Sequence, residues 1–218
     1  MRKKIYLTLL SVIILFSGFY WEIPTSFATT ILPVPYDRQD RRLSCEAASL
    51  KMILAYRGIA ATEDDIMTFI GYDPTPKSGK IWGDPDIGFV GNINGAQNTT
   101  GYGVHPTPVG RAANIWRPSI VFSGLSVQQL AQSIVDGNPV IIWGTYGRAL
   151  YQPWFTPEGK KVHAWKGEHT RVVVGFTGTV ENPKSFIMLD PLFGKMTWST
   201  TKLRNDWKKF GYSGVVVY

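Results

Sequence analysis

The order of helix-like and strand-like segments constrains the fold of this 218-residue chain more than any other feature. Segments with helix caps or helical spacing come first, at 45–57, 62–70, 109–116 and 126–135. β-Branched runs then follow Pro139, at 140–143, 171–176, 186–189, 195–198 and 214–218, with one helical stretch at 201–210. Helices followed by a mostly antiparallel sheet predict an α+β fold. Residues 71–105, rich in Gly, Asp, Asn and Pro, are expected to form a long ordered loop.

The first residues have the pattern of a secretory signal peptide. Arg2, Lys3 and Lys4 precede an apolar run, and the segment ends in Ser-Phe-Ala at 26–28. We therefore expect residues 1–28 to be a signal peptide and residues 29–218 to be one secreted or surface-held domain, with an uncleaved membrane anchor as the alternative. Cleavage would remove three basic residues and one acidic residue, which lowers the formal net charge from +7 to +5.

The composition excludes several classes of protein. A single cysteine, Cys45, rules out an intrachain disulfide framework and a multi-cysteine zinc ribbon. His163 and His169 lack a third metal ligand at a suitable spacing, so neither a metal nor another cofactor is expected. The basic residues after the signal are scattered, which argues against a nucleic-acid partner.

Cys45 occupies the first position of the helix expected after Ser44, the predicted N-cap. Unpaired backbone N–H groups and the helix dipole favour an anion there, so the pKa of the thiol is expected to fall and a nucleophilic thiolate to form. The structural alternative is that a lone cysteine is inert core filling.

His169 and Asp190 flank two runs, 170–176 and 185–189, that resemble the strands of a hairpin. A hairpin centred near residue 180 places His169 opposite Asp190, on the same face and within hydrogen-bonding distance. A histidine held by a carboxylate can accept a proton from a thiol, which predicts a triad of Cys45, His169 and Asp190. Taken separately, His169 could be a surface residue at the start of a strand, and Asp190 a turn residue.

Gln39 lies six residues before Cys45. Its side-chain amide and the Cys45 backbone N–H could donate two hydrogen bonds to an oxyanion, although an exposed loop glutamine fits the sequence as well.

Several segments together resemble papain-fold cysteine peptidases. They are Gln39 to Leu50, Trp82 to Pro85 with Gly88 to Gly91, Gly101 to Val104, Gly167 to His169, and Leu189 to Pro191. The similarity is to the domain that removes double-glycine leaders in bacteriocin exporters (cysteine peptidase family thirty-nine), and in particular to its free-standing secreted bacterial relatives. It covers residues 31–218 and implies Cys45 as nucleophile, His169 as base, Asp190 as orienting residue and Gln39 as oxyanion donor.

Two differences from the exporter domains bear on the substrate and the thiol. The chain carries a predicted signal peptide and no transporter, so leader removal is not the expected reaction. Glu46 stands where the exporter motif favours glycine, which places an acid beside Cys45. We expect a monomeric thiol hydrolase that acts on a peptide or protein amide bond, with cell-wall peptides among the candidates. The alternative is an inactive papain-fold module that binds peptide or envelope polymer.

Overall fold

The computed structural model describes residues 28–218, and the predicted signal peptide lies almost entirely outside them. The helices are α1 (Cys45–Tyr56), α2 (Glu63–Ile70), α3 (Pro106–Ala113), α4 (Val127–Val135), α5 (Thr200–Trp207) and a 3-10 turn, η1 (Lys208–Phe210). The long strands are β5 (Val140–Tyr151), β8 (Trp165–Gly178), β9 (Pro183–Asp190) and β10 (Gly194–Ser199). The shorter strands are β1 (Thr29–Ile31), β2 (Tyr72–Asp73), β3 (Phe89–Val90), β4 (Ser119–Phe122), β6 (Trp154–Phe155), β7 (Lys161–Val162) and β11 (Gly214–Val217). Helices precede a mostly antiparallel sheet, which confirms the predicted α+β class.

The main sheet has seven strands in the order β10-β9-β8-β5-β11-β4, and β1 joins it beside β8. All of these pairings are antiparallel. β8 lies inside the sheet and pairs along both of its edges. β9 pairs along one edge, and along the other edge β5 pairs as far as Val173 and β1 pairs from Gly175 to Thr177. The strand that carries His169 is therefore held on both sides.

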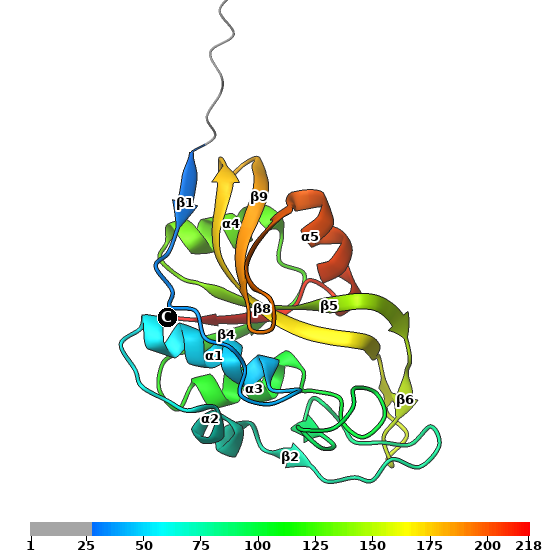
Figure 1. Cartoon of the computed structure of the whole chain (residues 1–218). Coiled ribbons are helices and arrows are strands. Elements are labelled where there is room, and N and C mark those ends of the chain that lie inside the picture. Colours follow the sequence, from blue (N-terminus) through cyan, green and yellow to red (C-terminus); the bar gives the residue numbers. More distant parts are fainter. Residues whose placement is uncertain (1–27) are drawn as a thin grey trace, which may run out of the picture.

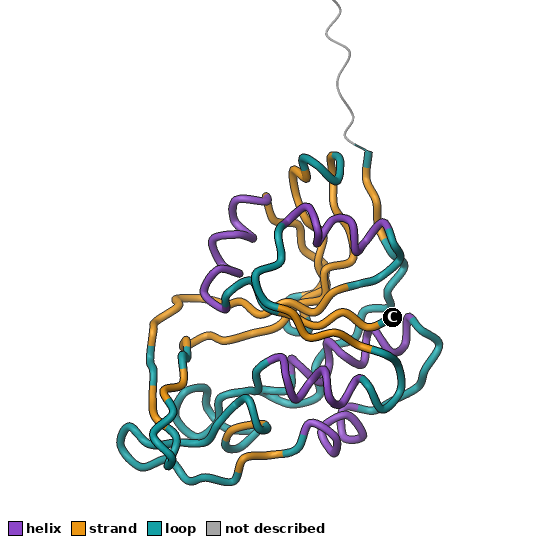
Figure 2. The backbone as a smooth tube through the Cα atoms, turned by 180° about the vertical axis from the view of Figure 1, so that it is seen from behind, coloured by secondary structure: helices purple, strands orange, loops and turns teal. Residues whose placement is uncertain are grey.

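Both faces of this sheet are covered by helices (Figures 1 and 2). Val172 and Val174 of β8 pack into a core with α1, α2 and α3. Val173, between them, packs into a second core with α4 and α5. Successive side chains of a strand point to opposite faces, so a strand covered on both sides reads as an unbroken apolar run.

The helices begin near their predicted positions for the expected reasons. Thr62 and Ser126 each form a capping box with the residue three positions later. Ser44 precedes α1 as predicted, but its hydroxyl bonds to the backbone of Arg41 and makes no side-chain cap. α3 begins at Pro106 and not at Val109, because proline is well suited to the first turn of a helix.

The long loop between α2 and α3 is ordered as predicted and contains the short parallel pair β2 and β3. It folds over a third apolar cluster, which includes Trp82, Tyr102 and Trp154. This packing brings Tyr102 and Gly103 toward the start of β8. Within residues 28–218, no helix combines the length and the apolar character needed to cross a membrane.

Candidate active site

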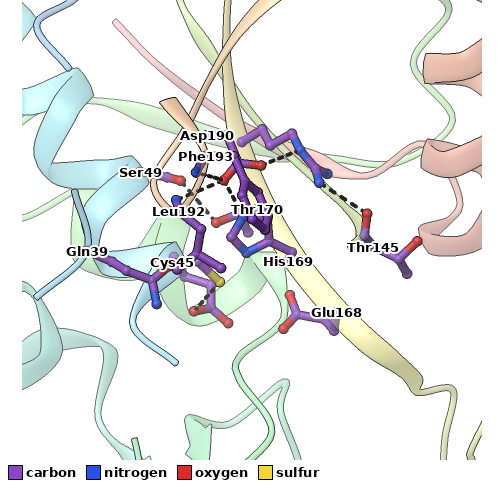
Figure 3. Close-up of polar contacts among 12 residues, drawn as sticks. Gln39, Cys45, Ser49, Thr145, Glu168, His169, Thr170, Asp190, Leu192 and Phe193 are labelled. Atoms are coloured by element: carbon purple, nitrogen blue, oxygen red, sulfur yellow. Dashed lines mark hydrogen bonds and ion pairs between the residues drawn. The ribbon is translucent and has the colours of Figure 1, made fainter. Parts of the chain in front are cut away.

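Cys45 is the first residue of α1 and points toward the start of β8 (Figure 3). The helix is anchored to that strand by a hydrogen bond of 3.0 Å between the hydroxyls of Ser49 and Thr170. Cys45 Sγ lies within 4.8 Å of a carboxylate oxygen of Glu168, and the backbone N–H of Thr170 acts on the thiol, so the sulfur is placed by the two neighbours of His169 in the sequence. The packing of α1 on β8 thus brings together Cys45 and Glu168, which are 168 − 45 = 123 positions apart.

His169 Nε2 lies 2.8 Å from Asp190 Oδ1, which is the hydrogen bond expected from the hairpin. The register differs slightly from that prediction because irregularities in the pairing shift β8 against β9. Val172 faces Leu189, so Arg171 comes opposite Asp190 one step further on, and His169 reaches the carboxylate diagonally. Diagonal neighbours in an antiparallel pair are still within reach of long side chains.

Arg171 holds the other oxygen of the same carboxylate. Its Nε lies 2.7 Å from Asp190 Oδ2, and its Nη2 donates to the carbonyl of Thr145 at 3.1 Å. Asp206 of α5 lies 3.6 Å from Nη1. The backbone N–H groups of Leu192 and Phe193 donate to Asp190 Oδ1. Asp190 is thereby fixed in one orientation, which in turn orients the imidazole.

The thiol is less acidic than its position at the helix start predicts, and this corrects our expectation. Burial raises the pKa of Cys45 well above its usual value, and the charges of Glu46 and Glu168 raise it further. The backbone N–H of Thr170 acts in the opposite direction but does not outweigh them. The thiol donates to Glu46 Oε2 at 3.2 Å. Desolvation and two nearby acids therefore overcome the helix dipole.

The other two triad residues have pKa shifts that define the resting state. Burial lowers the pKa of His169, and the hydrogen bond to Asp190 offsets only part of that effect. Burial opposes ionisation of Asp190, but the hydrogen bond and charge of His169 and the charge of Arg171 outweigh it and hold its pKa below the usual value. At neutral pH the site therefore contains a thiol, a neutral imidazole and a carboxylate.

We expect Glu46→Gln to lower the pKa of Cys45 and to speed its alkylation, because the substitution removes a negative charge beside the sulfur. The measurement is the rate of iodoacetamide modification against pH in the purified protein. Wild type should react slowly at pH 8 and faster as pH rises, whereas Glu46→Gln should reach the same rate at lower pH. The exposed Glu158→Gln is the matched control. Identical pH profiles for wild type and Glu46→Gln would contradict the assignment.

Gln39 lies near the start of α1, and its backbone N–H is tied to the carbonyl of Pro191, next to Asp190. Its side-chain Nε2 donates to the carbonyls of Arg41 and Arg42, at 2.6 and 2.9 Å. Both amide protons are thus engaged, so the side chain must rotate before it can donate to an oxyanion. The oxyanion role of Gln39 stays a prediction.

Two aromatic rings flank the imidazole. The rings of Tyr146 and Phe193 lie with centroids 5.4 and 6.4 Å from that of His169. The same two residues line a cavity of about 750 Å³, which extends over Arg171 toward Trp198 and Asp206. Phe193 is 61% exposed, so much of this residue is accessible to solvent. The lining of the cavity includes none of Cys45, His169 and Asp190, so it is a neighbouring cavity with room for a peptide side chain.

Three residues of the site were not identified from the sequence. Arg171 lies two residues after His169 on β8, and residues two apart on a strand point to the same face. The alternation of a strand could therefore have predicted that Arg171 lies near the site. Gln97 binds both ends of the Gly167–Glu168 segment, donating to the Glu168 carbonyl at 2.6 Å and accepting from the Gly167 N–H at 3.1 Å. Neither Gln97, in the long loop, nor the buried Glu168 has a local signal that predicts its position.

Comparisons with known proteins agree with this fold. A sequence model described as Peptidase_C39 like family matches residues 31–215. This match covers most of the chain, so the chain belongs to the Peptidase_C39-like family.

Several individual proteins are similar to this chain. The chain is 28% identical over 180 residues to the uncharacterized protein YvpB of Bacillus subtilis (strain 168), covering 79% of this chain and 68% of YvpB. The crystal structure of a putative C39-like peptidase from Bacillus anthracis is similar with a TM-score of 0.75 and 26% identity, covering 88% of this chain and 98% of that one. A double glycine motif protease from an AMS/PCAT transporter, in complex with the leader peptide, has 16% identity and a TM-score of 0.48, covering 85% of this chain and 90% of that one.

Proposed function

We propose that this protein is a cysteine peptidase that hydrolyses a peptide or amide bond with Cys45, His169 and Asp190. The observation that carries the proposal is the 2.8 Å hydrogen bond from His169 to Asp190, formed beside a cysteine at a helix start. Family membership supports the same chemistry. A histidine oriented by a carboxylate next to a thiol has the arrangement of nucleophile, base and orienting group.

The protonation states favour proton transfer during attack over a preformed ion pair. Neutral His169 accepts the Cys45 proton as the sulfur bonds to the substrate carbonyl, and Asp190 stabilises the resulting imidazolium. The imidazolium then protonates the leaving amine, and a water molecule activated by His169 releases the acid from the thioester. The Cys45 backbone N–H, at the helix N-terminus, stabilises the oxyanion together with Gln39 once that amide has rotated.

A substrate search tests this proposal. The purified protein is incubated with peptide libraries derived from secreted proteins and from cell-wall stem peptides, and products are identified by mass spectrometry. Cleaved products are expected with wild type and should be absent with Cys45→Ala. Equal product yields from both proteins would assign the cleavage to a contaminant and leave the proposal without support.

One observation favours a second candidate function. The thiol is only 4% exposed and donates to Glu46, an arrangement that suits a module without catalysis. In that case the cavity beside Tyr146 and Phe193 would hold a peptide or an envelope polymer. This function would be identified if wild type and Cys45→Ala bind the peptide or polymer equally well and wild type does not cleave it.

We also propose that the protein is secreted or surface-held after cleavage behind Ala28. The support is the signal-like pattern of the first residues. β1 begins at Thr29, the first residue after the predicted cleavage site, and pairs with β8. N-terminal sequencing of the protein recovered outside the cell should begin at Thr29. Recovery of a chain that still starts at Met1 in the membrane fraction would show that the segment is retained as an anchor.

A further inference from the structure

A buried cluster of acidic groups lies beside α1, and the proposed reaction uses only one of them. Cys45, Glu46 and Glu168 each offer a ligand atom, and the three atoms lie within 4.8 Å of one another. Glu168 is 1% exposed, and within residues 28–218 neither of its carboxylate oxygens has a hydrogen-bond partner. A buried carboxylate without a partner is costly, so this arrangement requires either a proton or a cation.

A backbone N–H fixes one of the two carboxylates, and a glycine leaves room for both. Glu46 Oε1 accepts from the Val104 N–H at 2.7 Å, which leaves Oε2 facing the sulfur of Cys45. A Cβ atom at Gly103 would lie 2.5 Å from Glu46 Oε1 and 2.5 Å from Glu168 Oε2. Glycine at this position therefore makes room for two carboxylates that converge from different elements. A carboxylate ligand is commonly held by a second hydrogen bond in metal sites, as the Val104 N–H holds Glu46.

The nearby cation, Arg171, forms its ion pairs with other acids. Arg171 acts to lower the pKa of Glu168, but its guanidinium is already engaged by Asp190 and Asp206. One sulfur and two carboxylates form a donor set for a borderline ion such as Zn²⁺, whereas Mg²⁺ and Ca²⁺ prefer oxygen donors alone. The 3.2 Å separation of Cys45 Sγ and Glu46 Oε2 is compatible with two ligands of one ion, given zinc–ligand distances of about 2.0–2.3 Å.

We propose that Cys45, Glu46 and Glu168 bind one divalent ion of the zinc type, with water completing its coordination. On binding, the thiol and any protonated carboxyl lose their protons to the buffer, and sulfur and oxygen lone pairs are donated to the ion without oxidation or reduction. The bound ion takes the sulfur lone pair that would attack the substrate, so metal binding also blocks hydrolysis. This inhibition rests on the proposed peptidase function, whereas the metal binding itself does not.

Titration of the purified, metal-free protein with Co²⁺ tests the site without any substrate. Wild type should bind one equivalent, with a thiolate-to-cobalt charge-transfer band and visible bands of four-coordinate cobalt, and Zn²⁺ should displace it. Cys45→Ala should lose the charge-transfer band. Glu168→Gln should raise the dissociation constant about tenfold or more, whereas the exposed control Glu158→Gln should not change it. Glu46→Gln, which keeps an oxygen for Val104, tests the second carboxylate if Glu168→Gln does not fold.

His169→Ala distinguishes the proposed site from nonspecific metal binding by Cys45 together with His169. The proposal predicts that His169→Ala retains cobalt binding. Loss of binding in His169→Ala, with full binding in Glu168→Gln, would overturn it, and so would the lack of saturable binding to wild type. The latter result would mean that protons alone neutralise the carboxylates, and it would leave the proposed hydrolysis untouched.

Discussion

His169→Ala is expected to reduce kcat on any substrate that the wild type cleaves by about 10⁴-fold, and Cys45→Ala to reduce it at least as much. The reason is that the resting thiol is protonated, since burial and two acids raise its pKa. Without His169, the base that takes this proton is missing. The measurement is single-turnover kinetics on a substrate from the library search.

Two features of the result distinguish a triad from a structural role. The double variant Cys45→Ala/His169→Ala should be no slower than the worse single variant, because residues that act as a unit are not additive. Substrate affinity, measured by equilibrium binding, should change little in either variant. A loss of less than about tenfold in His169→Ala would exclude it as the general base.

Arg171→Leu is expected to lower the free energy of unfolding by about 3–5 kcal/mol at pH 7. The substitution leaves the buried carboxylate of Asp190 without its ion-pair partner at 2.7 Å and removes the donor to the Thr145 carbonyl. Urea unfolding measures the change. The exposed Arg148→Leu on β5 is the control, with an expected change within about 0.5 kcal/mol.

The double variant Arg171→Leu/Asp190→Leu isolates the interaction. It should be less destabilised than the sum of the two single variants, because removing both charges leaves neither one uncompensated. The pH dependence provides a second check. Asp190 has a lowered pKa in the folded protein, so its contribution is present above its unfolded pKa and is lost as pH falls through the folded pKa. A cost below about 1 kcal/mol for Arg171→Leu would contradict the assigned ion pair.

The two acids beside Cys45 have shifted pKa values of their own. Burial raises the pKa of Glu46 to about 7 and that of Glu168 well above its usual value. Glu46 therefore changes charge near neutral pH, directly beside the sulfur. We therefore expect Glu46 to control the reactivity of the thiol, and in the proposed metal site it is also a ligand.

The sequence by itself determined the order of the main helices and long strands, where most helices begin, and that His169 and Asp190 lie close together, but it missed the edge strands β1 and β4 and the full lengths of β5 and β8. The correct predictions depend on local signals: Thr62 and Ser126 are followed by their capping partners, and the apolar runs around 172 and 187 predict one hairpin. A hairpin is a short-range structure, so its facing residues can be estimated from the length of its loop. The error of one to two positions arose from bulges, which the strand pattern does not reveal.

Only the tertiary structure decided the environment of the thiol. A helix N-terminus predicts a lowered pKa, but Glu168 reaches Cys45 through the packing of α1 on β8. Gly103 comes from a loop, 57 residues after Glu46 and 65 residues before Glu168. The position of Arg171 opposite Asp190 likewise depends on the register. Burial and charge are sums over groups distant in the sequence, so they set the pKa values of this site only once the chain is folded.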